Sequence, residues 1–194
     1  PPAPLPPHHR HHTDDHPPRY HPTDKVNPPL RTAADVEAVR EGLADGTIDI
    51  VATDHAPHAR EDKDCEWAAA AFGMTGLETA LSVVQQTMVD TGRMTWADVA
   101  RVLSSAPARI GRIDTGERAQ GRPLEVGEPA NVTLVDPAAR RVVDGAGQAT
   151  ASTNTPFQGR ELPGAVVASF LRGRAAVLGR APGAPGAGGR AGGA

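Results

Sequence analysis

The chain has 194 residues, a formal net charge of −3 and an aromatic content of 3%. This length allows one domain of ordinary size, or one and a fraction, and the small negative charge argues against an electrostatic nucleic-acid-binding protein. A single cysteine, Cys65, excludes an internal disulfide framework and a thiolate zinc site, so a reducing cytoplasm is the default compartment. No apolar run approaches the roughly 18 residues of a membrane span, and no signal peptide is visible.

The two ends of the chain differ in composition from its middle. Residues 1–23 are rich in Pro and His and lack apolar periodicity, while residues 180–194 contain only Gly, Ala, Pro and Arg. Neither stretch can bury a core, so both are expected to be disordered. Between them, we expect one unit over residues 24–112 and a second, smaller β module over residues 113–179.

The first unit is predicted to contain three helices and one short strand. Each helix is expected to open with a capping box, in which a Thr is followed three residues later by an acid. The three boxes are Thr32–Asp35, Thr75–Glu78 and Thr95–Asp98. The β-branched run Ile48–Ala52 is predicted to be a strand, and residues 53–71 a long loop that follows it.

The second unit is predicted to be built from short strands. Residues 132–136 and 141–144 have the composition of two strands, and residues 166–171 and 176–178 flank Gly173 as a hairpin. This style differs from the helix-rich part and indicates a small β module.

Two segments carry most of the functional information, residues 25–31 (KVNPPLR) and residues 52–58 (ATDHAPH). Together they resemble dihydroorotase of the long bacterial type, within the amidohydrolase superfamily. Residues 154–157 (NTPF) resemble the C-terminal motif of the same family, and the match extends from about residue 7 to residue 178. The resemblance implies an α/β fold: the C-terminal part of an amidohydrolase (β/α)₈ TIM barrel plus a small β-sandwich module.

The resemblance implies a role for Asp54 as a zinc ligand that also acts as the catalytic acid and base. It implies that Asn27 hydrogen-bonds the ring amide of the substrate and that His58 contacts the carboxylate side of the substrate. Taken without the resemblance, these residues would be a turn Asp after a strand, a turn Asn before Pro and a solvated loop His.

Three neighbouring residues are further candidates. The pair Phe72 and Gly73 resembles a backbone contact of the family with its substrate, and the alternative is a loop Gly beside a packed Phe. For His55 two roles are open, support of the Asp54 side chain and a purely structural role.

The implied function is dihydroorotase: reversible, zinc-dependent hydrolysis of dihydroorotate to N-carbamoyl-aspartate in pyrimidine biosynthesis, on a small-molecule substrate and without a nucleic-acid or membrane partner. The family's His-x-His pair, its bridging carboxylate or carboxylated Lys and two further His ligands are missing, so the chain is expected to be truncated and inactive alone. A zinc site needs at least three protein ligands, and Asp54 is one. A related cyclic amidohydrolase of the dihydropyrimidinase type and a non-catalytic barrel remnant are the alternatives, and homo-oligomerisation of the full-length parent is left open.

Overall fold

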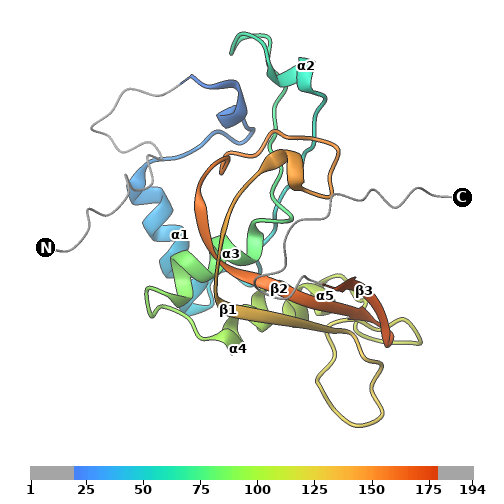
Figure 1. Cartoon of the computed structure of the whole chain (residues 1–194). Coiled ribbons are helices and arrows are strands. Elements are labelled where there is room, and N and C mark those ends of the chain that lie inside the picture. Colours follow the sequence, from blue (N-terminus) through green and yellow to red (C-terminus); the bar gives the residue numbers. More distant parts are fainter. Residues whose placement is uncertain (1–19, 179–194) are drawn as a thin grey trace, which may run out of the picture.

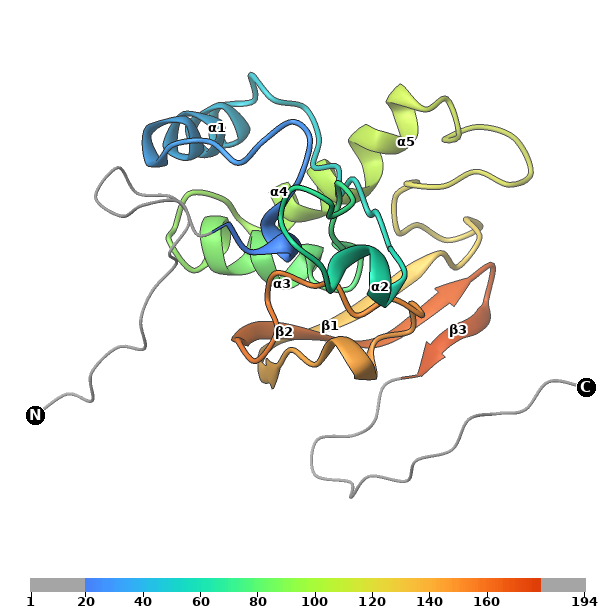
Figure 2. The same ribbon diagram turned by 90° about the horizontal axis from the view of Figure 1, so that it is seen from above.

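The computed structural model describes residues 20–178. Helices α1, α3, α4 and α5 lie on one side of a β-sheet, as the view from above shows (Figure 2). Along the chain the α-helices come first and the strands last, with the short 3-10 helix Gly145–Gly147 (η4) between the first two strands (Figure 1). The expectation of disorder over residues 180–194 falls outside the described residues, as does the one over residues 1–23 up to residue 19. The short 3-10 helix Pro22–Asp24 (η1) overlaps the end of that first stretch.

Helix α1 (Ala33–Asp45) confirms the first capping box. The Thr32 hydroxyl accepts a hydrogen bond from the Asp35 backbone N–H, and the Asp35 carboxylate accepts one from the Thr32 N–H in return. The helix ends at Gly46, whose φ of 86° is a left-handed conformation that Gly adopts at little cost. Its one buried residue, Leu43, reaches the core.

The expected strand Ile48–Ala52 is wrong as an element, because residues 48–52 form no strand and pair with none among the described residues. A β-strand needs a neighbour for its backbone hydrogen bonds, and no strand of the described residues lies beside it. Its backbone bonds go instead to helical neighbours, from Ile48 N–H to Gly42 O at 2.8 Å and from Val51 N–H to Val102 O at 3.1 Å.

The second helix begins later than its capping box predicted. Helix α3 (Ala80–Val84) starts five residues after Thr75, and its N-cap Thr79 makes no side-chain capping bond. The Thr75 hydroxyl is instead directed to Gln148 at 3.5 Å, and the Glu78 carboxylate accepts from the Ala149 N–H at 2.9 Å. These contacts with the β module override the local signal. The helix continues as the π-helical turn Gln85–Val89 (η2).

The third helix keeps its capping box and runs further than the apolar pattern indicated. The Thr95 hydroxyl and Asp98 carboxylate cap helix α4 (Trp96–Ala100) reciprocally. The helix then passes through the π-helical segment Arg101–Ser105 (η3) into helix α5 (Ala106–Ile110). The expected loop over residues 53–71 contains a further short helix, α2 (Arg60–Lys63).

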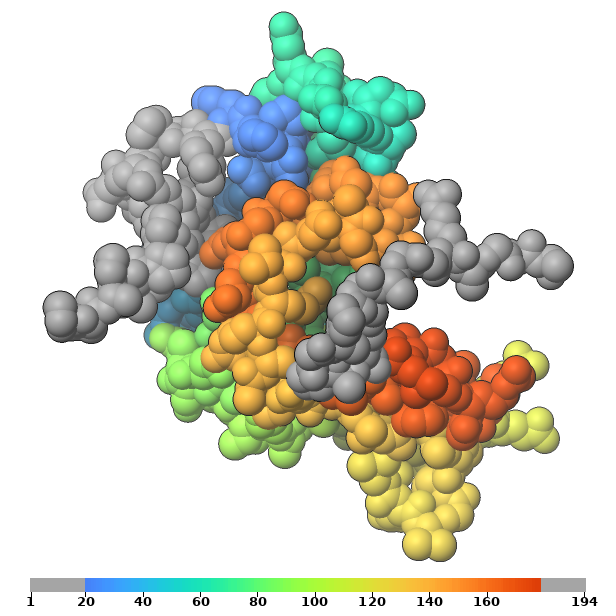
Figure 3. Space-filling view, in the orientation of Figure 1, coloured from blue at the N-terminus to red at the C-terminus, as the bar shows by residue number. Residues whose placement is uncertain are grey.

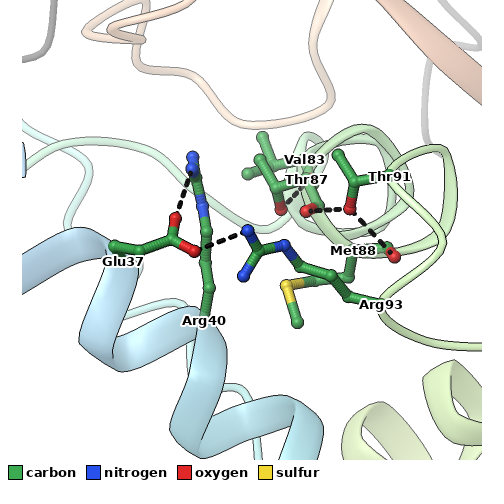
Figure 4. A network of polar contacts seen from close by, with 7 residues as sticks. All are labelled: Glu37, Arg40, Val83, Thr87, Met88, Thr91 and Arg93. Carbon is green, nitrogen blue, oxygen red and sulfur yellow. Dashed lines mark hydrogen bonds and ion pairs between the residues drawn. The ribbon is translucent and has the colours of Figure 1, made fainter.

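The core of the helical side joins these elements. The buried cluster comprises Leu43, Val84, Met88, Met94, Val99 and Val102, with Ile48 and Val51 packed against it. An ion pair on its rim connects α1 to the chain after η2, because the Glu37 carboxylate meets Arg93 at 2.5 Å and Arg40 at 3.6 Å (Figure 4). Both partners of the Glu37–Arg93 pair are a third or more exposed, so the pair contributes at most about 1 kcal/mol.

The β module is one antiparallel sheet in the order β1-β2-β3. The two strands expected over residues 132–144 form a single strand, β1 (Val132–Val142), with an irregular register between Asp136 and Arg140. The expected hairpin is confirmed as β2 (Glu161–Leu171) and β3 (Arg174–Leu178). Its turn residues Arg172 and Gly173 both have positive φ, as a two-residue type I′ turn requires.

Helix α3 with η2 packs against β2 and anchors the sheet to the helical side. The Gln85 amide donates to Pro137 O at 2.9 Å, and the Arg141 guanidinium donates to Glu78 O. On the sheet, Leu162 is fully buried, while every residue of β3 is exposed. No helix among residues 20–178 has the length and apolar character required to cross a membrane.

Candidate active site

Three segments that are far apart in the sequence meet above the sheet. They are residues 25–31, residues 53–75 with α2, and residues 148–157; in the space-filling view the blue, teal and orange surfaces adjoin one another there (Figure 3). Backbone hydrogen bonds join them, from Gly73 N–H to Lys25 O at 2.9 Å and from Thr75 N–H to Asn154 O at 3.1 Å. The two candidate motifs and the NTPF segment therefore lie in one region of the structure, which is the candidate site.

His58 and the Phe72–Gly73 pair are in direct contact. The distance from His58 Nε2 to Phe72 O is 2.8 Å, and because a carbonyl only accepts, the Nε2 atom carries the proton of this bond. Gly73 has a φ of 134°, and a Cβ added there would lie 2.5 Å from Ala56 Cβ and 2.8 Å from His58 Nε2. Only Gly leaves room for the imidazole in this position.

The pairing leaves specific atoms free for a ligand. The Gly73 carbonyl accepts from Lys63 Nζ and Asn154 Nδ2, and the Gly73 N–H donates to Lys25 O. The Phe72 carbonyl is occupied by His58. Among the described residues, the Phe72 N–H has no partner, and so it is the donor of this pair that remains available. On His58, the remaining ring nitrogen is Nδ1, which donates a hydrogen bond only when the imidazole is protonated.

Asp54 stands on the same segment, four residues before His58. Its φ of 45° is a left-handed conformation, which is uncommon for a residue other than Gly and concentrates at functional sites. The chain immediately after it is fixed by a parallel bridge between His55 and Met74 and by a bond from Ala56 N–H to Met74 O at 2.9 Å. The side chain is exposed, and the carboxylate has no hydrogen-bond or ion-pair partner among the described residues.

His55 has a structural task. Its Nδ1 atom accepts hydrogen bonds from the backbone N–H groups of Gly76 at 3.1 Å and Leu77 at 3.3 Å. The proton of the neutral ring is therefore on Nε2. The bonds hold the turn before α3 against the site segment, and within residues 20–178 no hydrogen bond connects His55 to Asp54.

Among the described residues, Asn27 makes no polar contact with this centre. Its side chain is exposed, and the described residues give it no hydrogen bond. It is positioned through the backbone, because Lys25, two residues before it, accepts from the Gly73 N–H. The structure thus joins His58, Phe72 and Gly73 directly, and connects Asp54 and Asn27 to them through short stretches of chain.

Two further polar residues of the site come from the NTPF region. Asn154 is 7% exposed, and its amide donates to Ala56 O at 3.2 Å and Gly73 O at 3.3 Å. Its Oδ1 atom and the Ser152 hydroxyl, which are hydrogen-bonded to each other, both accept from the His58 N–H, at 3.4 and 3.2 Å. The sequence presented Asn154 as part of a family motif, and only the fold shows that it holds the His58 and Gly73 segments together.

The donor set is suited to one part of a metal site. The unpartnered Asp54 carboxylate is free to bind a cation, whereas His55 and His58 each use one ring nitrogen in an internal hydrogen bond. Within residues 20–178, no group of three or more His, Cys, Asp or Glu side chains is arranged to hold a metal ion. The described residues therefore fit a single ligand, Asp54, and a complete site would need ligands from elsewhere in the protein.

The fold is similar to that of cyclic-amide hydrolases. The chain superposes on L-hydantoinase (dihydropyrimidinase) from Arthrobacter aurescens with a TM-score of 0.74 and 30% identity, covering 83% of this chain and 36% of that one. D-hydantoinase (dihydropyrimidinase) from Thermus sp. gives a TM-score of 0.70 and 25% identity over 81% of this chain. These neighbours place the fold among the amidohydrolases, in agreement with the fold class predicted from the sequence.

The sequence relatives are more specific. Dihydroorotase from Streptomyces coelicolor is 63% identical over 176 residues, which are 91% of this chain and 40% of the relative. Dihydroorotase from Mycobacterium tuberculosis is 55% identical over 172 residues, 89% of this chain and 39% of the relative. No protein-family model matches the chain. Over about 90% of its own length the chain is therefore similar to dihydroorotases, and it spans about 40% of the length of the curated relatives it matches.

Proposed function

We propose that this chain supplies the proton-transfer carboxylate and part of the substrate-binding surface of a dihydroorotase, which hydrolyses dihydroorotate reversibly to N-carbamoyl-aspartate in cytoplasmic pyrimidine biosynthesis. One observation carries the proposal. Residues 52–58 and the Phe72–Gly73 pair are joined by the bond between His58 Nε2 and Phe72 O, with the exposed, unpartnered Asp54 on the same segment.

In this proposal Asp54 moves the proton. Its carboxylate accepts a proton from the attacking water and returns it to the amide nitrogen that leaves the ring, so that the ring opens without expelling an unprotonated amine anion. A zinc ion bound with the help of Asp54 would lower the pKa of water and polarise the amide carbonyl. Asp54 combines a left-handed backbone with an exposed side chain, and its carboxylate has no hydrogen-bond or ion-pair partner among residues 20–178.

The remaining residues bind and orient the substrate. The Nε2 atom of His58 is bonded to Phe72 O, which leaves Nδ1 available. When the imidazole is protonated, Nδ1 can donate a hydrogen bond to the carboxylate of dihydroorotate. The Phe72 N–H is available for an oxygen of the substrate, and the Asn27 amide offers both a donor and an acceptor to the ring amide. None of these three groups transfers a proton to the reacting bond.

The test is the Asp54→Asn variant of the full-length protein that contains this chain. The amide keeps the size of the side chain but cannot accept a proton, so turnover of dihydroorotate is expected to fall by at least about 10²-fold with the fold intact. Asn27→Ala is the matched variant, and it should raise KM with a smaller effect on kcat. Near-wild-type turnover by Asp54→Asn would refute the assigned role.

A dihydropyrimidinase-like activity is the second candidate, favoured by the structural similarity to L-hydantoinase (dihydropyrimidinase). The two activities differ in whether the substrate carries a carboxylate. A dihydroorotase should prefer dihydroorotate, and His58→Ala should abolish that preference. Faster hydrolysis of dihydrouracil than of dihydroorotate by the wild-type protein would favour the second candidate.

A further inference from the structure

The distribution of cationic residues in this chain is uneven. The sequence contains two lysines, Lys25 and Lys63, and every other Lys or Arg position is Arg. Both lysines are 8% exposed, although Lys is seldom buried without a paired acid. Both lie in the segments that build the candidate site. The need for a positive charge alone does not explain why Lys stands at positions 25 and 63, because Arg supplies the positive charge at every other position.

Lys63 lies in a cradle of three backbone carbonyls. Its Nζ atom donates to Ala71 O at 2.8 Å, to Gly73 O at 2.9 Å and, at 3.5 Å, to Lys25 O. An ammonium has three donors and is compact, whereas a guanidinium is a planar fork that does not converge on three carbonyls around one point. Within residues 20–178, Lys63 forms no ion pair with a carboxylate.

These three carbonyls belong to the two segments that carry substrate contacts. Ala71 and Gly73 flank Phe72, whose own carbonyl holds His58. Lys25 lies two residues before Asn27, and its carbonyl also receives the Gly73 N–H. One side chain on α2 therefore fixes the separation of the Asn27 segment from the Phe72–Gly73 pair.

The neighbouring lysine completes the arrangement from the other side. Lys25 Nζ donates to Trp67 O at 2.9 Å and Ala68 O at 3.0 Å, and it stands 4.6 Å from the centre of the Phe72 ring. Burial and the proximity of Lys25 both lower the pKa of Lys63. Two buried cations at close range oppose each other, so retaining both in this loop has an energetic cost.

We propose that Lys63 is a positioning residue for substrate binding: its ammonium fastens the Asn27 segment to the Ala71–Gly73 segment and so sets where the Asn27 amide, the Phe72 N–H and the His58 ring meet the substrate. Lys63 itself touches no substrate. The role rests on the proposed function, because it concerns the substrate contacts of that site.

The test compares Lys63→Met with Arg60→Met in the full-length protein. Met keeps an unbranched side chain but no donor. Arg60 lies on the same helix and is highly exposed, so its replacement removes a cation without touching the cradle. We expect Lys63→Met to raise KM for dihydroorotate about tenfold or more while kcat changes less than about threefold, and Arg60→Met to change neither.

Amide hydrogen exchange supplies a readout that does not depend on activity. In Lys63→Met, exchange should accelerate in peptides covering residues 69–75 and leave helix α1 unchanged, because the loss is local. Lys63→Gln, which keeps two donors on a shorter side chain, provides a milder second variant with the same direction of change. If the wild-type protein does not hydrolyse dihydroorotate, the proposed function fails. Hydrogen exchange still tests the Lys63 clamp, which is the set of hydrogen bonds from Lys63 Nζ to the carbonyls of Ala71, Gly73 and Lys25.

Two outcomes would overturn the proposal. One is an unchanged KM together with unchanged exchange at residues 69–75 in both Lys63 variants. The other is faster exchange that extends through helix α1, together with a fall in kcat of more than about threefold. Lys63 would then support the fold in general and not the substrate segments.

Discussion

At the scale of single residues, the site depends on close approach at Gly73. The position combines a φ of 134° with an Ala56 methyl and a His58 imidazole where a side chain would begin. A residue with a Cβ would have to move the ring that is assigned to the substrate carboxylate. The hydrogen bond between His58 and Phe72 would be displaced with it.

Gly73→Ala is therefore expected to raise KM for dihydroorotate and to destabilise the full-length protein by about 1–3 kcal/mol. Gly92→Ala is the matched control, because Gly92 also has a positive φ but has no atom within 4 Å of an added Cβ. It should show the backbone cost without the change in KM. Measurements of steady-state kinetics and thermal unfolding on both variants check this, and an equal KM in the two variants would contradict it.

At the scale of elements, the capping boxes at α1 and α4 make a contribution to stability that depends on pH. Hydrogen bonds from the Thr32 side chain and backbone lower the pKa of Asp35, and those from the Thr95 backbone and side chain lower the pKa of Asp98. A carboxyl group whose pKa is lower in the folded state stabilises that state when ionised. This contribution is present above the ordinary Asp pKa and is lost as the pH falls through the folded-state value.

For the full-length protein, the urea concentration at half unfolding is expected to be lower at pH values below the ordinary Asp range than at neutral pH. The Asp98→Asn variant should show a smaller difference between the two pH values. Comparing the variant with wild type at each pH cancels effects of other carboxylates, including any metal loss. Thr95→Ala should cost about 1 kcal/mol at neutral pH, as expected for a lost N-cap. A pH dependence that is identical in Asp98→Asn and wild type would exclude this contribution.

At the scale of the whole molecule, the isolated chain presents uncovered apolar surface. Exposed apolar side chains on the sheet include Leu134, Val166, Val167, Leu171 and Val177, and residues 48–52 have no strand partner within residues 20–178. Exposed sheet edges and apolar patches promote association with other chains.

The 194-residue chain by itself is therefore expected to aggregate or to unfold without a sharp transition, to lose zinc on dialysis and to show no dihydroorotate turnover above a zinc blank. The proposed site has one metal ligand in this chain, Asp54, and a stable zinc site needs at least three protein ligands. Light scattering, calorimetry, metal analysis and an activity assay test each part. A monodisperse monomer that retains stoichiometric zinc, and loses it in Asp54→Ala, would show that the site is complete within this chain.

The features that the sequence determined are local. Helix α1, the cap at Thr95 and the β2–β3 hairpin follow from capping residues, apolar spacing and the Gly173 turn, all within a few residues of each other. The motif residues also indicated the resemblance to dihydroorotase, because they are read directly from the chain. Such features depend on neighbours in sequence and form wherever the chain allows them.

The tertiary structure decided what depends on distant partners. The segment Ile48–Ala52 has the composition of a strand, but no strand among the described residues lies beside it. Thr75 does not cap a helix, because its side chain is directed to Gln148 in the β module. The carbonyls that bind Lys63 come from positions up to 38 residues away in sequence, so no local pattern could reveal the clamp. The rarity of lysine in an Arg-rich chain was the one sequence signal, and its meaning came from the fold, because burial and hydrogen bonding are properties of the packed molecule.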